Sequence, residues 1–342
     1  MGRVYVGLET GSRSCSLAVR TPEGDVIDRR TFETGEKTLI EAFTSLPGEV
    51  HVHLEASELS AWVRRVIKPL VARVVVSHPK SNAWIGKDPL KNDRIDADKL
   101  SEMLRQGNVH EVYYGDDEGR TEFKRLVQHY DQVTRDEARL KRDIKARLRA
   151  QGLIVKDQSI FTKEGRSEIL ARVTCLTARA SIGQLYAILE AALKAQDLAD
   201  RLMRKESRKY PEIARFDEAP GIGPVLACRF SAYIQTPHRF SNKRKVWRYC
   251  RLGVAWRTSD GQPLNHQSLD RNGCGALKDF SRKAFQGMLI TKKDNAFKRA
   301  FRSACQSTGN PTHARLTVQR KIVATLWSMW KKGERYQDNY AG

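Results

Sequence analysis

Hydrophobic and polar positions follow one pattern in residues 1–118 and a different one after it. Apolar residues alternate with polar ones in short runs that are separated by turns containing glycine, serine or proline, which is typical of strands. One longer stretch, ELSAWVRRVIKPL, has helical spacing. The strand-like runs are RVYVGLE, SCSLAVR, DVIDRRTFE, VHVHL and ARVVVSHP. This order predicts an α/β domain with three antiparallel strands, followed by strand, helix and strand.

Apolar residues in 119–208 recur instead at steps of three, four and seven, which predicts two long charged helices with heptad-like seams. We expect an antiparallel coiled-coil arm, formed within one chain or between chains, with an ordinary helical bundle as the alternative. The two seams consist of Phe123, Leu126, Tyr130, Val133, Leu140 and Ile144, and of Ile182, Leu185, Leu189, Ala192, Ala199 and Met203.

The sequence pattern of residues 209–342 predicts a third, mostly helical domain. It opens with FDEAPGIGPVLACRFSAYI, where a glycine-rich turn precedes an apolar helix, as in a helix-hairpin-helix element. Backbone amides freed by Gly221 and Gly223 at such a helix N-terminus can bind a phosphate. A tight turn between two helices with no ligand is the alternative for this segment.

The formal charge of +21 and the pI near 9.9 favour a polyanionic partner, because cationic side chains that neutralise phosphates release condensed counterions. A basic segment interleaved with Trp247 and Tyr249 suits phosphate tracking with base stacking, and a solvated helical face is the alternative. Its cations are Lys243, Arg244, Lys245, Arg248 and Arg251. The six cysteines form no CxxC pair, which argues against a zinc ribbon or a disulfide scaffold. With no long apolar run, we expect a cytoplasmic, nucleoid-associated protein with no membrane partner.

Four carboxylates fall at the ends of predicted elements. Glu9 ends the first strand, Glu55 ends the strand VHVHLE, and Asp93 and Asp96 share one face of a helical turn. Carboxylates brought together repel one another unless divalent cations bridge them, and two such ions can clamp a phosphodiester. The alternative is structural: Asp93 caps a helix, and Asp96 or Asp98 pairs with Arg94 or Lys99. We interpret Asp98 as a supporting or surface residue.

Several motifs, taken in their order along the chain, resemble those of the bridge-RNA-guided insertion-sequence transposases. These are also called DEDD transposases or serine recombinases with a RuvC-like domain. The motifs that carry the resemblance are GLETGSRSCSLAV, HLEAS, KNDRIDADKL, PGIGPVLA, HRFSNKRKVWRYCRLGV and RTSDGQPLNHQSLDRNGCGALK. The resemblance implies a RuvC-like (ribonuclease-H-like) domain in 1–118, a coiled-coil connector in 119–208 and a transposase domain in 209–342. The family's first acid is usually aspartate, so Glu9 departs from its pattern by one methylene.

The resemblance also implies a mechanism. Glu9, Glu55, Asp93 and Asp96 hold Mg²⁺ or Mn²⁺, and Ser259 is the nucleophile that links transiently to DNA. Thr258, Ser268 and His266 are nearby alternatives or helpers. The implied partners are donor and target DNA, a structured guide (bridge) RNA, and further copies of the chain in a homodimer or tetramer.

Three other functions stay open at this point. A metal-dependent nuclease or junction resolvase would use the acids alone. A catalytically inactive nucleic-acid-binding relative would keep only the basic surface. An actin-like kinase would need a second glycine-rich phosphate loop before a helix, and the second half of the sequence offers none.

Overall fold

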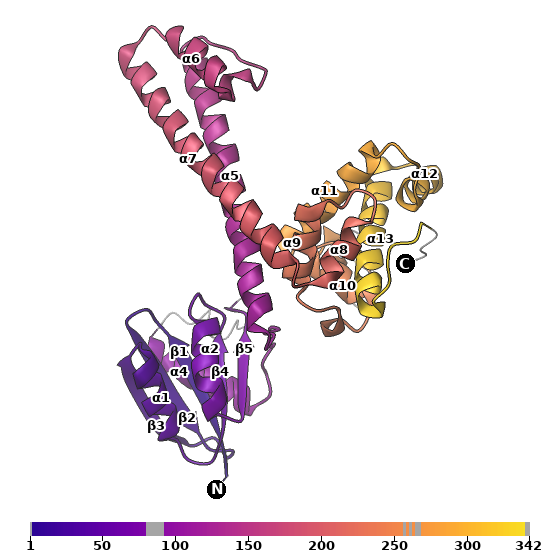
Figure 1. Ribbon diagram of the computed structural model, residues 1–342. Coiled ribbons are helices and arrows are strands. Elements are labelled where there is room, and N and C mark those ends of the chain that lie inside the picture. The colour runs from indigo at the N-terminus through magenta and orange to yellow at the C-terminus, as the bar shows by residue number, and fades with distance from the viewer. Residues whose placement is uncertain (1, 80–91, 256–257, 260–261, 264–267, 339–342) are drawn as a thin grey trace. The chain divides into compact units, whose positions relative to one another are not determined.

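The computed structural model describes residues 2–79, 92–255, 258–259, 262–263 and 268–338 (Figure 1). The chain divides into two compact units, Met1–Asp116 and Asp117–Gly342. None of the helices in the described ranges combines the length and the apolar character needed to cross a membrane.

The first unit is built on a mixed five-stranded sheet with the order β3-β2-β1-β4-β5. β1, β2 and β3 are antiparallel neighbours, while β1, β4 and β5 run parallel. The strands are β1 (Arg3–Thr10), β2 (Ser14–Arg20), β3 (Val26–Glu33), β4 (Glu49–Glu55) and β5 (Arg73–Ser77). The antiparallel strands β1, β2 and β3 come first along the chain and are followed by β4, a helix and β5, as the sequence pattern predicted, and the α/β unit is consistent with a RuvC-like domain.

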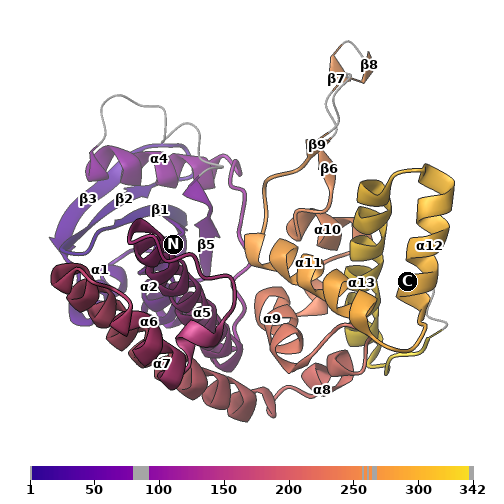
Figure 2. The same cartoon turned by 90° about the horizontal axis from the view of Figure 1, so that it is seen from above.

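Helices cover both faces of this sheet (Figure 2). α1 (Glu36–Thr44) and α2 (Ser60–Ile67) cover one face, where alternate strand residues such as Leu8 and Leu54 form the hydrophobic core. α2 continues into a 3₁₀ turn, Lys68–Leu70. α4 (Asp93–Arg105) covers the opposite face. α1 is not among the elements that the sequence pattern predicted, and it buries only Leu39, Ala42 and Phe43.

Gly7 on β1 sets how closely α4 approaches the sheet. A Cβ atom at this position would lie 2.0 Å from the carbonyl oxygen of Ala97 and 2.5 Å from the amide nitrogen of Ser101. Both atoms belong to the backbone of α4, so they cannot move aside as a flexible side chain would. Glycine therefore allows the helix to lie directly on the strand.

Two long helices begin the second unit and pack against each other in antiparallel directions (Figure 1). Phe123 near the start of α5 (Glu118–Ala150) contacts Tyr210 just beyond the end of α7 (Leu176–Ser207), with ring centroids 4.8 Å apart. At the other end, Leu148 packs in one cluster with Ile182. The 3₁₀ turn Ser159–Phe161 and α6 (Lys163–Ala171) lie between the two helices in sequence. The predicted helices thus pair within one chain, and pairing between chains stays a prediction.

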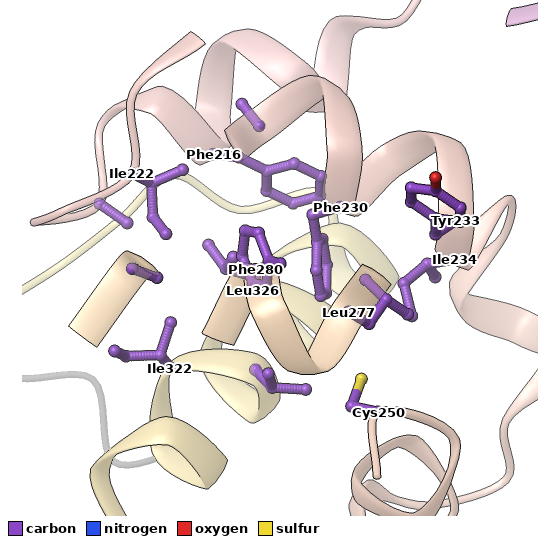
Figure 3. Close-up of a cluster of buried hydrophobic side chains, with 14 of the residues drawn as sticks. Phe216, Ile222, Phe230, Tyr233, Ile234, Cys250, Leu277, Phe280, Ile322 and Leu326 are labelled. Atoms are coloured by element: carbon purple, nitrogen blue, oxygen red, sulfur yellow. The ribbon is translucent and has the colours of Figure 1, made fainter. Parts of the chain in front are cut away.

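The rest of the second unit is a helical domain around an aromatic core that includes Phe216, Phe230 and Phe280 (Figure 3). Its elements are α8 (Pro211–Asp217), α9 (Pro224–Ile234), the 3₁₀ turn Pro237–Arg239, α10 (Lys243–Tyr249), β6 (Val254–Ala255), β7 (Thr258–Ser259), β8 (Gln262–Pro263), β9 (Ser268–Leu269), α11 (Gly275–Ile290), α12 (Ala296–Thr308) and α13 (Pro311–Lys332).

A buried polar network joins α5 to α9. Arg229 Nε donates to Asp131 Oδ1 at 2.6 Å, and the hydroxyl of Tyr233 donates to Asp131 Oδ2 at 3.0 Å. All three residues are buried. The Asp131 carboxylate compensates the buried guanidinium, so the network fixes how the long helix meets the helical domain.

Candidate active site

Glu9 and Glu55 lie beside each other at one end of the first unit's sheet. The parallel pairing places Leu8 opposite Leu54, and each glutamate is the next residue on its strand. Because strand side chains alternate, both glutamates lie on the face opposite to that of the buried leucines. Beyond the strand ends, the hydroxyl oxygens of Thr10 and Ser57 are 3.2 Å apart, which holds the two chain segments together.

The N-terminal turn of α4 lies toward the same end of the sheet. Arg94 Nε donates to the hydroxyl of Thr31 at 3.4 Å, and Thr31 pairs with Ser16, which in turn pairs with Glu9. Further along the helix, Ala97 packs over Gly7, two residues before Glu9. The helix thus runs antiparallel to β1, which brings Asp93 and Asp96 to the level at which Glu9 and Glu55 end their strands.

The first turn of α4 corrects one structural interpretation of Asp93. Asn92 is the N-cap, since its side chain accepts a hydrogen bond from the amide of Arg94 at 3.0 Å. Asp93 is therefore the first helical residue and not the cap. It is exposed, and Asp96 is half-buried. Carboxylates in a first helical turn are favoured by the helix dipole, which offsets part of their mutual repulsion.

Asp98 has a separate role on the same helix. Arg29 Nε donates to both of its carboxylate oxygens, at 3.1 and 2.9 Å, and Arg20 Nη2 lies 3.8 Å from Oδ1. These arginines come from β3 and β2, so Asp98 fastens α4 to the sheet. This position agrees with its interpretation as a supporting residue.

The donor set fits a hard divalent cation. Four carboxylates from β1, β4 and α4 supply only oxygen ligands, which suits Mg²⁺ or Mn²⁺. Within the described residues, however, no three histidine, cysteine, aspartate or glutamate side chains stand close enough to hold a metal ion. The ligand assignment to Glu9, Glu55, Asp93 and Asp96 therefore stays a prediction.

His53 positions α4 and was missed by the sequence analysis. Its Nδ1 lies 2.8 Å from the carbonyl oxygen of Leu100 on α4, and its Nε2 lies 2.8 Å from the hydroxyl of Ser77 on β5. The neutral ring donates to the carbonyl and accepts from the serine. The VHVHLE alternation, which puts His53 on the face of Glu55, and the lone glycine inside β1 were the available signals.

Burial of His53 predicts a pH-dependent stability of the first unit. Desolvation lowers its pKa to about 4, despite the hydrogen bond to Leu100, which raises it. The unfolded chain therefore takes up the proton first, near the ordinary value of 6.5, and stability falls as the pH drops from about 6.5 to about 4. The full loss is about 3 kcal/mol of unfolding free energy.

Urea denaturation in metal-free buffer between pH 7.5 and 4 measures this effect. A His53→Gln variant keeps a polar side chain but cannot titrate. Between pH 7.5 and 4, its unfolding free energy is therefore expected to fall by about 3 kcal/mol less than that of the wild type. Equal pH dependence in the two proteins would contradict the assignment to His53.

Ser259 belongs to the second unit, on a short pair of strands. It lies on β7 and pairs with Gln262 of β8, and β6 pairs separately with β9. In Figure 2 the β7–β8 pair lies beyond β6 and β9, away from the helices. Thr258 shares the strand of Ser259 and Ser268 lies on β9, whereas His266 is outside the described residues.

The predicted phosphate-tracking segment forms α10 and the turn after it. Lys243, Arg244 and Lys245 are exposed in its first turn. Arg248 pairs with Asp270 at 2.8 Å. The helix thus presents cations to solvent, as either interpretation of the segment requires.

The two aromatic rings of this segment contribute to packing. Trp247 Nε1 donates to the carbonyl of Arg320 at 2.9 Å, and the guanidinium of Arg239 lies 4.5 Å from the ring centre of Tyr249. Both rings are half-buried against the core of the helical domain. A base that stacks here would reach only part of each ring.

The glycines of PGIGP have different surroundings. Gly221 has a φ of +83°, and a Cβ there would lie 2.4 Å from the backbone nitrogen of Met288 on α11. Gly223 is the N-cap of α9 and has no atoms within 4 Å of an added Cβ. Close helix packing accounts for Gly221, and space for a ligand remains only at Gly223. Phosphate binding by the two glycines stays a prediction.

Two family models match the chain, and both describe transposases. Residues 6–151 match a transposase model of the DEDD type found in IS110 elements, and residues 213–298 match the model of the transposase IS116/IS110/IS902 family. The first match contains all four acids, and the second contains Ser259 and α10. No curated protein matches the chain. The DEDD-type domain indicates a need for a divalent metal. The two matches, in this order, indicate that the chain is a DNA transposase and support one of the IS110 type.

Proposed function

We propose that the protein is an RNA-guided DNA transposase that cuts and rejoins DNA through a transient phosphoserine link at Ser259. The observation that carries the proposal is the placement of Glu9, Glu55, Asp93 and Asp96 at one end of the sheet, inside a region that matches DEDD transposases. The second match contains Ser259, and this supports its proposed role as the nucleophile.

The chemistry balances without a further reactant. Ser259 Oγ forms a bond to the phosphorus of a DNA phosphodiester as the bond from phosphorus to the 3′ oxygen breaks, and the proton lost by the serine balances the proton gained by that oxygen. A 3′ hydroxyl of another strand then attacks the phosphoserine and releases the serine. A divalent cation held by the four acids would stabilise the negative charge that develops on the phosphate.

Charge and the family matches support the proposed partners. An excess of 21 positive charges suits a protein that holds the backbones of donor DNA, target DNA and a guide RNA together. In this proposal, base pairing by the guide RNA selects the sequence, and the protein reads mainly phosphates. Ser259 and the acids belong to different units, so a homodimer or tetramer can combine the serine of one copy with the acids of another.

Trapping of a covalent protein–DNA adduct tests the nucleophile. Purified protein is incubated with its co-purified RNA, Mg²⁺ and end-labelled element-end DNA, then denatured and resolved by gel electrophoresis. We expect Ser259→Ala to abolish the adduct, because alanine has no oxygen to attack phosphorus. Ser268→Ala makes the same change on β9 and is expected to keep the adduct.

Two results would contradict the proposal. An adduct that depends on Ser268 and not on Ser259 would move the nucleophile to β9. Full Mg²⁺-dependent cleavage by both variants, with no adduct from the wild type, would favour a nuclease that uses the acids alone.

A further inference from the structure

A large pocket lies in the second unit beside the β6–β9 pair. Its volume is about 940 Å³, and residues of β6, β9, α11 and α13 line it. Six of the sixteen lining residues are basic. They are Arg251, Lys278, Arg282, His313, Arg315 and Arg320, with histidine counted only when it is protonated.

The positive charge of this pocket is poorly compensated. Asp279 is the one carboxylate among the lining residues, and it lies 2.6 Å from Arg282 and 2.7 Å from Lys283. Across the described part of the chain, no carboxylate pairs with Arg251, Lys278, Arg315 or Arg320. Uncompensated cations facing one concavity raise the local potential and attract anions.

Two of the arginines are held in place by the backbone. Arg320 Nε donates to the carbonyl of Leu252 at 2.8 Å, and Arg251 Nε donates to the carbonyl of Gly273 at 2.9 Å. Burial lowers the pKa of Arg320. Arg251 has a φ of +56°, a strained value for a residue with a side chain. Anchored guanidinium groups of this kind are preorganised to bind an anion.

The other cations can adapt to a ligand. Lys278 on α11 and Arg315 on α13 are exposed, and neither side chain has a hydrogen bond or ion pair with a described residue. Apolar side chains also line the pocket, among them Leu252, Val254 and Leu316. Cations beside apolar walls suit a phosphate with its attached sugar or base.

We propose that this pocket binds the phosphodiester backbone of DNA. The bound nucleotides belong to the strand that Ser259 attacks or to the strand beside it. The inference rests on the proposed function, because β6 and β9, which form one wall of the pocket, flank β7 and Ser259 in the sequence. Several cations and a volume of about 940 Å³ exceed the needs of one free phosphate and suit consecutive nucleotides.

A double variant tests the pocket without disturbing the core. Lys278→Ala/Arg315→Ala removes two exposed cations, one from each helix. Lys292→Ala/Lys293→Ala removes the same charge from an exposed loop between α11 and α12 and serves as the matched control. Fluorescence anisotropy measures the Kd of the full-length proteins for labelled dT₈ and rU₈ oligonucleotides over a range of salt concentrations. Thermal melting by circular dichroism verifies that each variant folds.

We expect the pocket variant to bind dT₈ roughly 10- to 30-fold more weakly at 0.1 M salt, and its log Kd to depend less steeply on log salt by about 1.4, because two phosphate contacts are lost. The control is expected to change both quantities much less. A loss for dT₈, alone or together with rU₈, supports the proposal. Equal behaviour of the two double variants, or a loss for rU₈ alone, overturns it.

The adduct assay separates this inference from the proposed function. If the pocket variant binds DNA more weakly but the wild type forms no phosphoserine adduct, the DNA-binding role of the pocket is supported and the role of Ser259 as nucleophile is rejected. A normal adduct with unchanged dT₈ binding would reject the pocket and leave Ser259 in place.

Discussion

Changing Asp96 to asparagine is expected to lower the rate of DNA strand cleavage in Mg²⁺ by roughly 10²- to 10³-fold. The substitution keeps the shape of the side chain and removes the negative charge that attracts a divalent cation. A bound metal contributes several kcal/mol to the stabilisation of a phosphodiester transition state, and each 1.4 kcal/mol corresponds to a factor of ten in rate. Single-turnover cleavage of labelled DNA measures the effect, and calorimetric titration with Mn²⁺ measures metal binding directly.

Asp98→Asn is the matched control, because it makes the same chemical change on the same helix. Asp98 pairs with Arg29 and Arg20 of the sheet, so this variant is expected to lose less than about 1 kcal/mol of stability and to cleave at nearly the wild-type rate. If the two variants lose cleavage and Mn²⁺ binding equally, the distinction between Asp96 and Asp98 is wrong. Normal Mn²⁺ binding and cleavage by Asp96→Asn would remove Asp96 from the metal site.

Changing Asp131 to alanine is expected to lower the unfolding free energy of the second unit by about 3–5 kcal/mol, because the buried guanidinium of Arg229 loses its compensating charge. The hydroxyl of Tyr233 loses its acceptor as well. Urea denaturation followed by circular dichroism at 222 nm measures the change, since this unit is mostly helical.

Two further variants give this prediction its controls. Asp136→Ala removes a partly exposed carboxylate from the same helix, where it pairs with Arg139 at 3.4 Å, and is expected to cost less than about 1 kcal/mol. The double change Asp131→Leu/Arg229→Met replaces the pair by apolar side chains and is expected to recover most of the loss. A cost for Asp131→Ala as small as that for Asp136→Ala would contradict a structural role of the network.

Local patterns in the sequence were enough to predict the strands of the sheet and their order along the chain. The alternation in β1 and β4 and the turns between strands predict the order of elements, and the parallel pairing of Leu8 with Leu54 then puts Glu9 beside Glu55. The heptad spacing likewise predicts α5 and α7. These features depend on residues close together in the chain, where periodicity is informative.

Interactions between distant residues were not predictable in this way. His53 and Leu100 are 47 positions apart, and Asp131 and Arg229 are 98 apart. No local spacing indicates that such residues meet. The cationic pocket is a similar case, because its side chains come from helices and strands that only the fold brings together. The cap of α4 was within reach, since Asn92 before Asp93 is as good an N-cap as aspartate.

The contact at Gly7 has a consequence for how this region can change in evolution. An added Cβ would collide with the main chain of α4, which is present whatever side chains the helix carries. A second substitution on α4 changes only a side chain and leaves this main chain in place, so it cannot compensate for the loss of the glycine. Position 7 is fixed independently of the residues around it, and the helix that presents Asp93 and Asp96 can vary its sequence only while that glycine stays.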